Sequence, residues 1–122
     1  MEKNTFRRAV EAGNLDEMVE AFTADAVLHS PVSFKPIVGR VAIRSLLSVL
    51  LQVFQDFRYT DQLHSDDGTC GLIFRARIGD RELEGLDLLR FDDSGKICDL
   101  TVMVRPRSAI EALRLEVGTR LT

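Results

Sequence analysis

The chain has 122 residues, enough for one domain with one hydrophobic core but too few for two. Its 45% hydrophobic and 29% charged residues exclude an intrinsically disordered chain. The net charge of -3, with acidic and basic residues interspersed, excludes the basic stripe that binds nucleic acid or anionic membranes. We therefore expect a single domain over residues 1–122, with neither nucleic acid nor a membrane as partner.

No part of the sequence predicts a membrane anchor, an export signal or a metal site. The most apolar stretch, residues 46–54, is interrupted by Ser48 and Gln52 and is shorter than the roughly 20 residues that span a bilayer. We find no secretory signal, and Cys70 and Cys98 lack the spacing of metal ligands. A glycine-rich phosphate loop and a nucleophile elbow are also missing from the sequence. We expect a cytoplasmic protein without a metal ion or cofactor.

The first 22 residues predict two short helices that form a hairpin. One face of the first helix collects residues three and four positions apart, namely Phe6, Ala9 and Val10. This helix is expected to end at Gly13, and Asn14 is suited to cap the next one, with Glu17 at its third position. The expected buried stripe of the second helix consists of Leu15, Met18, Val19 and Phe22.

The middle of the chain predicts a short strand and a long buried helix. Residues 26–28 form the strand, which Pro31 ends, and an irregular loop runs on to Gly39. From residue 41 to residue 54 the pattern is apolar nearly all round. Such a helix must be covered on most of its sides by the rest of the fold.

The C-terminal half predicts an antiparallel meander, because its hydrophobic period changes to two. The expected strands cover residues 57–63, 72–78, 83–91 and 97–104, with turn sequences between them. Pro106 stops the last strand, and residues 109–117 predict a terminal helix with one apolar edge. The whole order predicts an α+β fold whose helices pack on one face of a strongly curved, mainly antiparallel sheet. The concave side of that sheet is the natural place for a pocket.

The last strand predicts a second packing surface on the sheet. Both of its faces are apolar near its end, with Thr101 and Met103 on one side and Val102 and Val104 on the other. One face can pack on the helices, which leaves the other to be covered by a second copy of the chain. We therefore expect a homodimer through the convex face of the sheet.

Asp87 is the most informative polar residue of the sequence. It shares strand parity with Leu83, Leu89 and Phe91, which places a carboxyl group on an otherwise apolar face. A carboxyl group in that place takes a hydrogen-bond partner or has its pKa raised. Two interpretations stay open: a carboxylate held for structural reasons, or the polar group of a pocket that Leu89 and Phe91 also line.

Other candidate site residues lie at the first strand, on the meander and in the first helix. His29 and Ser30 precede Pro31, and at most one of them points inward because adjacent strand residues face opposite sides. For His29 a structural imidazole and a general acid or base are both possible. Tyr59 is either a core aromatic residue or a hydroxyl donor to a ligand. The expected ligand-binding set is Phe6, Ser30, Tyr59, Leu89, Phe91 and Met103.

Several short runs together resemble the nuclear-transport-factor-two-like superfamily, and its SnoaL-like branch most closely. These runs are Gly13-Asn14-Leu15-Asp16, Phe22-Thr23-Ala24-Asp25-Ala26, Ser30-Pro31, Gly39-Arg40, Asp87-Leu88-Leu89-Arg90-Phe91 and Gly95-Lys96-Ile97. The resemblance covers nearly the whole chain and implies a cone-shaped α+β barrel with a deep apolar cavity, often in a dimer. The superfamily includes ketosteroid isomerases, polyketide cyclases and epoxide hydrolases, so the fold does not settle the function.

The ketosteroid isomerases of that superfamily allow a comparison residue by residue. Their protonated aspartate, which donates to the developing oxyanion, corresponds to Asp87. Their general base corresponds to Ser30 and their hydrogen-bonding tyrosine to Phe6, and neither side chain can do the same chemistry. The resemblance therefore argues against classical steroid isomerisation and leaves any chemistry to Asp87, His29 and Tyr59.

Three functions are compatible with these residues. The first is an uncharacterised SnoaL-like protein that binds a small apolar molecule in the cavity. The second is a cofactor-independent isomerase, cyclase or hydratase-like enzyme that uses Asp87 with His29 as catalytic residues. The third is a dimerisation module without a ligand.

Overall fold

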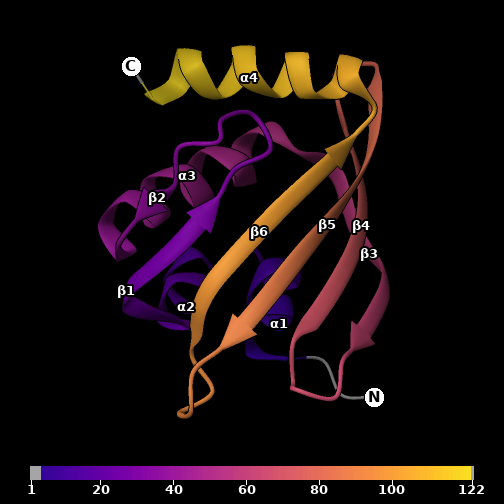
Figure 1. Cartoon of the computed structure of the whole chain (residues 1–122). Helices are drawn as coiled ribbons and strands as arrows, with labels where there is room; N and C mark the ends of the chain where they lie inside the picture. The colour runs from indigo at the N-terminus through magenta and orange to yellow at the C-terminus, as the bar shows by residue number, and fades with distance from the viewer. Residues whose placement is uncertain (1–3, 122) are drawn as a thin grey trace.

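A computed structural model describes residues 4–121 and contains a curved sheet with helices against its concave side (Figure 1). The helices are α1 (Thr5–Ala12), α2 (Leu15–Glu20), α3 (Arg40–Val53) and α4 (Arg107–Leu121). The strands are β1 (Phe22–His29), β2 (Ile37–Val38), β3 (Gln55–His64), β4 (Cys70–Ile78), β5 (Arg81–Phe91) and β6 (Ile97–Arg105). The predicted α+β class is confirmed.

The sheet has the order β2-β1-β6-β5-β4-β3, so β2 and β3 are its edges and the curved sheet remains unclosed. Strands β3 to β6 form the predicted antiparallel meander, whereas β1 pairs with β6 in parallel. Register shifts interrupt three of the pairings, for example between Arg90 and Phe91 on β5. Irregularities of this kind bend a sheet and increase its twist, which gives this one its concave face.

The ends of the first two helices follow from local hydrogen bonds and from the backbone conformation at Gly13. The Asn4 side chain accepts from the Arg7 N–H at 2.7 Å and begins α1. Gly13 ends that helix with a φ of 65°, a left-handed conformation that glycine adopts without strain. The Asn14 side chain then accepts from the Glu17 N–H at 3.1 Å, which confirms the predicted cap of α2.

The prediction that Phe22 belongs to the stripe of α2 is wrong. The helix ends at Glu20, and Phe22 begins β1, four residues earlier than the sequence predicts. The pairing partner explains the difference: Phe22 lies opposite Ile97, and the Ile97 N–H donates to the Ala21 carbonyl at 2.8 Å. A distant strand therefore decides this boundary.

The hydrophobic core lies between the concave face of the sheet and the helices. Its largest fully buried side chains include Phe22, Leu28, Ile43, Leu72, Phe74, Leu89, Ile97 and Leu100. Helix α4 crosses one end of the sheet, where it contacts β4, β5, β6 and α3 (Figure 1). No helix within residues 4–121 is both long and apolar enough to cross a membrane.

An apolar cavity with a buried carboxyl group as candidate functional site

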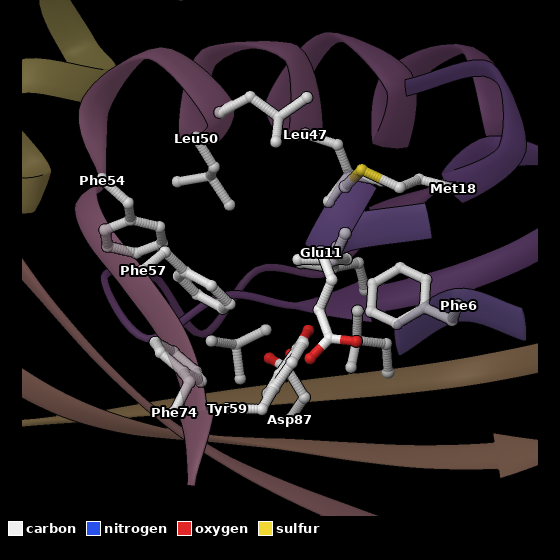
Figure 2. Close-up of a pocket in the computed structure, with 15 residues that line it drawn as sticks. Phe6, Glu11, Met18, Leu47, Leu50, Phe54, Phe57, Tyr59, Phe74 and Asp87 are labelled. Atoms are coloured by element: carbon white, nitrogen blue, oxygen red, sulfur yellow. The ribbon is translucent and has the colours of Figure 1, made fainter. Parts of the chain in front are cut away.

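A cavity of about 140 Å³ lies between the concave sheet face and the helices α1, α2 and α3 (Figure 2). Most of its wall is apolar, and the side chains come from every long strand of the sheet and three helices. The lining residues are Phe6, Val10, Glu11, Met18, Leu28, Leu47, Leu50, Leu51, Phe54, Phe57, Tyr59, Phe74, Asp87, Leu100 and Val102. Engineered apolar cavities of about 150 Å³ bind benzene, so this volume suits a ligand core of about one ring.

Asp87 and Tyr59 form the polar centre of this cavity. The Tyr59 hydroxyl donates to Asp87 Oδ2 at 3.2 Å, and Asp87 is only 7% exposed. The predicted parity of Asp87 with buried residues of β5 is confirmed, since Leu83 and Leu89 are buried on the same face. The sequence alone did not predict that Tyr59 would be its partner.

Burial changes the protonation of both groups. Loss of solvent raises the pKa of Asp87 from 3.8 to about 7, against the opposing effect of the Tyr59 hydrogen bond. Burial and the neighbouring Asp87 raise the pKa of Tyr59 well above its usual value. Below about pH 7 the site therefore presents a neutral carboxylic acid and a neutral phenol, each with one O–H donor. While the Tyr59 hydroxyl donates to Asp87, the carboxylic acid has the O–H that is free for a ligand, and one ligand oxygen can accept from both groups when it replaces the bond between them.

Aromatic rings form one wall of the cavity. Phe57 stacks on Phe74 with ring centroids 4.9 Å apart, and it meets Tyr59 edge to face at 5.0 Å. Phe54 lies 5.9 Å from Phe74. Packed rings of this kind have few rotamers, so they hold Tyr59 in place and exclude water from Asp87.

Charged side chains of α1 lie at the edge of the cavity. The Arg7 guanidinium lies 5.4 Å from the centre of the Tyr59 ring, and its Nη1 donates to Gln62 Oε1 at 2.9 Å. Arg7 Nε also pairs with Glu11 Oε2 at 3.4 Å. Glu11 lines the cavity, and Figure 2 shows its carboxylate reaching toward Tyr59 and Asp87. Sequence reasoning missed Glu11, although it directly follows Val10 of the predicted buried face.

The structure brings only part of the predicted ligand-binding set into the cavity. Phe6 and Tyr59 line it. Leu89 is fully buried in the core but does not line the cavity, and Phe91 lies beyond the register shift of β5, in a separate surface cleft beside α1. The prediction that Met103 binds the ligand must be corrected. Met103 is 54% exposed on the convex face, because its neighbour Val102 points into the cavity.

His29 and Ser30 also need correction, since neither of them lines the cavity. Leu28 points into it, so the adjacent His29 faces the other side of the sheet. There His29 Nε2 lies 2.9 Å from Asp99 Oδ2, and both side chains are partly exposed. Ser30 lies in the same outer groove, where its hydroxyl accepts from the Val32 N–H at 3.1 Å. The structure therefore does not bring His29 together with Asp87.

No group of three or more His, Cys, Asp or Glu side chains among residues 4–121 is arranged to hold a metal ion. The polar side chains of the cavity wall are those of Asp87, Tyr59 and Glu11. The donors can bind an oxygen, and the carboxylate of Glu11 can accept a proton or a hydrogen bond.

Comparisons with known proteins agree with this fold. Residues 4–100 match the model of the SnoaL-like domain. A steroid delta-isomerase from Pseudomonas aeruginosa has a similar structure, with a TM-score of 0.90, 43% identity, and coverage of 93% of this chain and 84% of that chain. An uncharacterised bacterial protein with a cystatin-like fold from Silicibacter pomeroyi also has a TM-score of 0.90, at 26% identity, with coverage of 96% and 82%.

A more distant neighbour is SalBIII, an epoxide hydrolase/cyclase-like enzyme with a role in pyran ring formation in salinomycin. It shares the fold at a TM-score of 0.70 and 21% identity, with coverage of 85% of this chain and 87% of that chain. No match is found among curated proteins. The sequence match and the fold together lead to one conclusion: the chain belongs to the SnoaL-like domain family, within the nuclear-transport-factor-two-like fold.

Proposed function

We propose that the protein binds a small, mostly apolar molecule through one acceptor oxygen, such as the carbonyl of a cyclic ketone. The observation that carries this proposal is the pair of Asp87 and Tyr59, two donors in a largely apolar cavity of about 140 Å³. A buried carboxylic acid is costly to keep unless it is satisfied by a partner. A ligand oxygen between these donors adds a hydrogen bond, while its ring contacts the aromatic wall.

Binding of 2-cyclohexenone tests this proposal, with cyclohexene as the matched ligand that lacks an acceptor. We expect the ketone to bind about tenfold more weakly at pH 8.5 than at pH 5.5, because Asp87 loses its donor proton near pH 7. Cyclohexene should bind equally at both pH values. Chemical-shift titration by NMR measures both affinities.

The variants Asp87→Asn and Asp87→Leu provide the matched controls. Asparagine keeps an N–H donor but cannot ionise, so ketone binding should lose its pH dependence. Leucine has no donor and should weaken ketone binding while cyclohexene binding persists. Ketone binding by the leucine variant with the affinity of the wild type would refute the proposed role of Asp87.

A second candidate function is cofactor-independent isomerisation of an unsaturated ketone. The 43% identity with a steroid delta-isomerase supports it, and so does the donor pair, which can stabilise the negative charge that develops on an enolate oxygen. This reaction does not use His29, which faces the outer groove. Conversion of 3-cyclohexenone to its conjugated isomer, followed by ultraviolet absorbance, tests it, and equal rates for wild type and Asp87→Leu would rule it out for this substrate.

We also propose that the protein forms a homodimer through the convex face of the sheet. A cross-strand row of apolar side chains, Ile73, Leu86 and Met103, crosses this face. In the next row Glu84 pairs with Arg75 at 3.3 Å and with Arg105 at 3.1 Å. A face that carries an apolar row beside charges of both signs can contact its own copy around a two-fold axis.

The substitution Met103→Glu should convert the dimer to a monomer, because it places a charge in the apolar row. Size-exclusion chromatography with light scattering should give twice 13.7 kDa for the wild type and 13.7 kDa for the variant at micromolar concentration. Leu115→Glu is the control, since Leu115 of α4 is similarly exposed, at 58% against 54% for Met103. A monomeric wild-type protein would refute the dimer.

A further inference from the structure

The cavity contains a second carboxyl group, in an environment that differs from that of Asp87. Glu11 comes from α1 and Asp87 from β5, so the two reach the cavity from opposite layers of the fold (Figure 2). The Glu11 side chain is 32% exposed and pairs with Arg7, whereas Asp87 is 7% exposed and accepts a hydrogen bond from the neutral Tyr59 hydroxyl. One carboxyl group thus lies beside a cation, and the other is desolvated.

Arg7 fixes where the Glu11 carboxylate lies. Its guanidinium packs over the Tyr59 ring at 5.4 Å, donates to Gln62 on β3 and pairs with Glu11 one helical turn away. Because Arg7 is tied both to the ring and to the strand, it holds Glu11 beside the donor pair. The charge of Glu11 is close enough to contribute to the raised pKa of Tyr59.

We infer that Glu11 is the proton-accepting residue of this cavity. This inference rests on the second candidate function above and assigns the base that neither Ser30 nor His29 supplies from the outer groove. A cyclic ketone whose oxygen lies at Asp87 and Tyr59 can place its neighbouring carbon on the α1 side of the cavity, where the Glu11 carboxylate reaches toward the donor pair (Figure 2).

The chemistry is a balanced proton transfer. A Glu11 oxygen takes the proton from the carbon next to the carbonyl. The C–H electron pair becomes a C=C bond, and the π electrons of the carbonyl move onto the oxygen, where Asp87 and Tyr59 stabilise them. Return of the proton to the far carbon of an unsaturated ketone gives the conjugated isomer, and return to the same carbon gives exchange with solvent. No oxidant, reductant or cofactor is needed.

Exchange of the α-hydrogens of cyclohexanone in D₂O, followed by NMR, tests this assignment. General-base catalysis contributes roughly a hundredfold or more, so Glu11→Gln should lower the exchange rate by about that factor. Its affinity for cyclohexanone should stay within about twofold of the wild type, which also shows that the variant is folded. Glu11→Asp, which keeps the carboxylate, should recover part of the rate.

Glu17→Gln is the matched control, because Glu17 is an exposed carboxylate on α2 that does not line the cavity. The Glu17→Gln variant should exchange the α-hydrogens of cyclohexanone at the rate of the wild type. An unchanged rate in Glu11→Gln, with a reduced rate in Asp87→Leu, would overturn the assignment of Glu11 and leave the enzymatic function standing. A wild-type protein that binds cyclohexanone without accelerating exchange would overturn both the assignment of Glu11 and the enzymatic function, while the binding function would remain.

Discussion

Replacing Asp87 with asparagine should stabilise the protein at pH 8 and leave its stability nearly unchanged at pH 4. Burial raises the pKa of Asp87 from 3.8 to about 7 in the folded protein. Unfolding returns the carboxyl group to water, where it ionises above about pH 4. The contribution of Asp87 to the free energy of unfolding is therefore fully present below about pH 4 and is lost as the pH rises from 4 toward 7. Above about pH 7 the loss stays constant.

The size of this effect follows from the difference between the two pKa values. About three pH units at 1.4 kcal/mol each give an upper value of about 4 kcal/mol at pH 8. Asparagine cannot ionise, so its variant avoids this loss and keeps a partner for the Tyr59 hydroxyl. Urea unfolding of both proteins at pH 4 and pH 8 measures the free-energy difference.

Asp80→Asn is the control for this experiment, because the Asp80 side chain is 97% exposed in the turn between β4 and β5. Its effect on the free energy of unfolding should be small and equal at both pH values. If Asp87→Asn changes the stability by the same amount at pH 4 and pH 8, Asp87 does not have a raised pKa in the folded protein, and the donor role proposed for it fails.

Local sequence patterns predict most of the fold because most of its elements are determined by interactions between residues close in the chain. The cap at Asn14 and the period-two meander depend on neighbours in the chain or across short turns. The start of β1 at Phe22 and its parallel pairing with β6 depend on residues far away in the sequence. No local pattern contains that information, so the strand is longer than predicted.

The sequence predicts those features of the site that depend on the alternation of side chains along a single strand. Parity places Asp87 among apolar residues and identifies its face as buried. Parity also shows that His29 and Leu28 point to opposite sides, but not which of them points inward. Met103 is ambiguous for a related reason: both faces of β6 are apolar near its end. Glu11 was missed because a carboxylate at the end of an amphipathic helix is ordinarily read as solvent-exposed.

Substituting Gly85 with alanine should both destabilise the protein and close the cavity to ligands. A methyl group at Gly85 would lie 2.1 Å from Cζ of Phe74, far inside van der Waals contact. Phe74 is buried and stacked on Phe57, so its ring can move only toward the cavity that both rings line. Overpacking of this kind costs about 1–3 kcal/mol. Urea unfolding should show that loss, and the displaced ring should abolish binding of 2-cyclohexenone.

Gly118→Ala separates this clash from the general effect of replacing a glycine. Gly118 lies in α4, and beyond its chain neighbours and the nearby backbone of its own helix no atom lies within 4 Å of an added methyl group. Alanine should therefore stabilise the helix by about 0.5–1 kcal/mol and leave ketone binding unchanged. The two substitutions add the same group with opposite expected signs, so only local packing distinguishes them. A Gly85→Ala variant that binds the ketone as tightly as the wild type would show that Phe74 does not define the cavity wall.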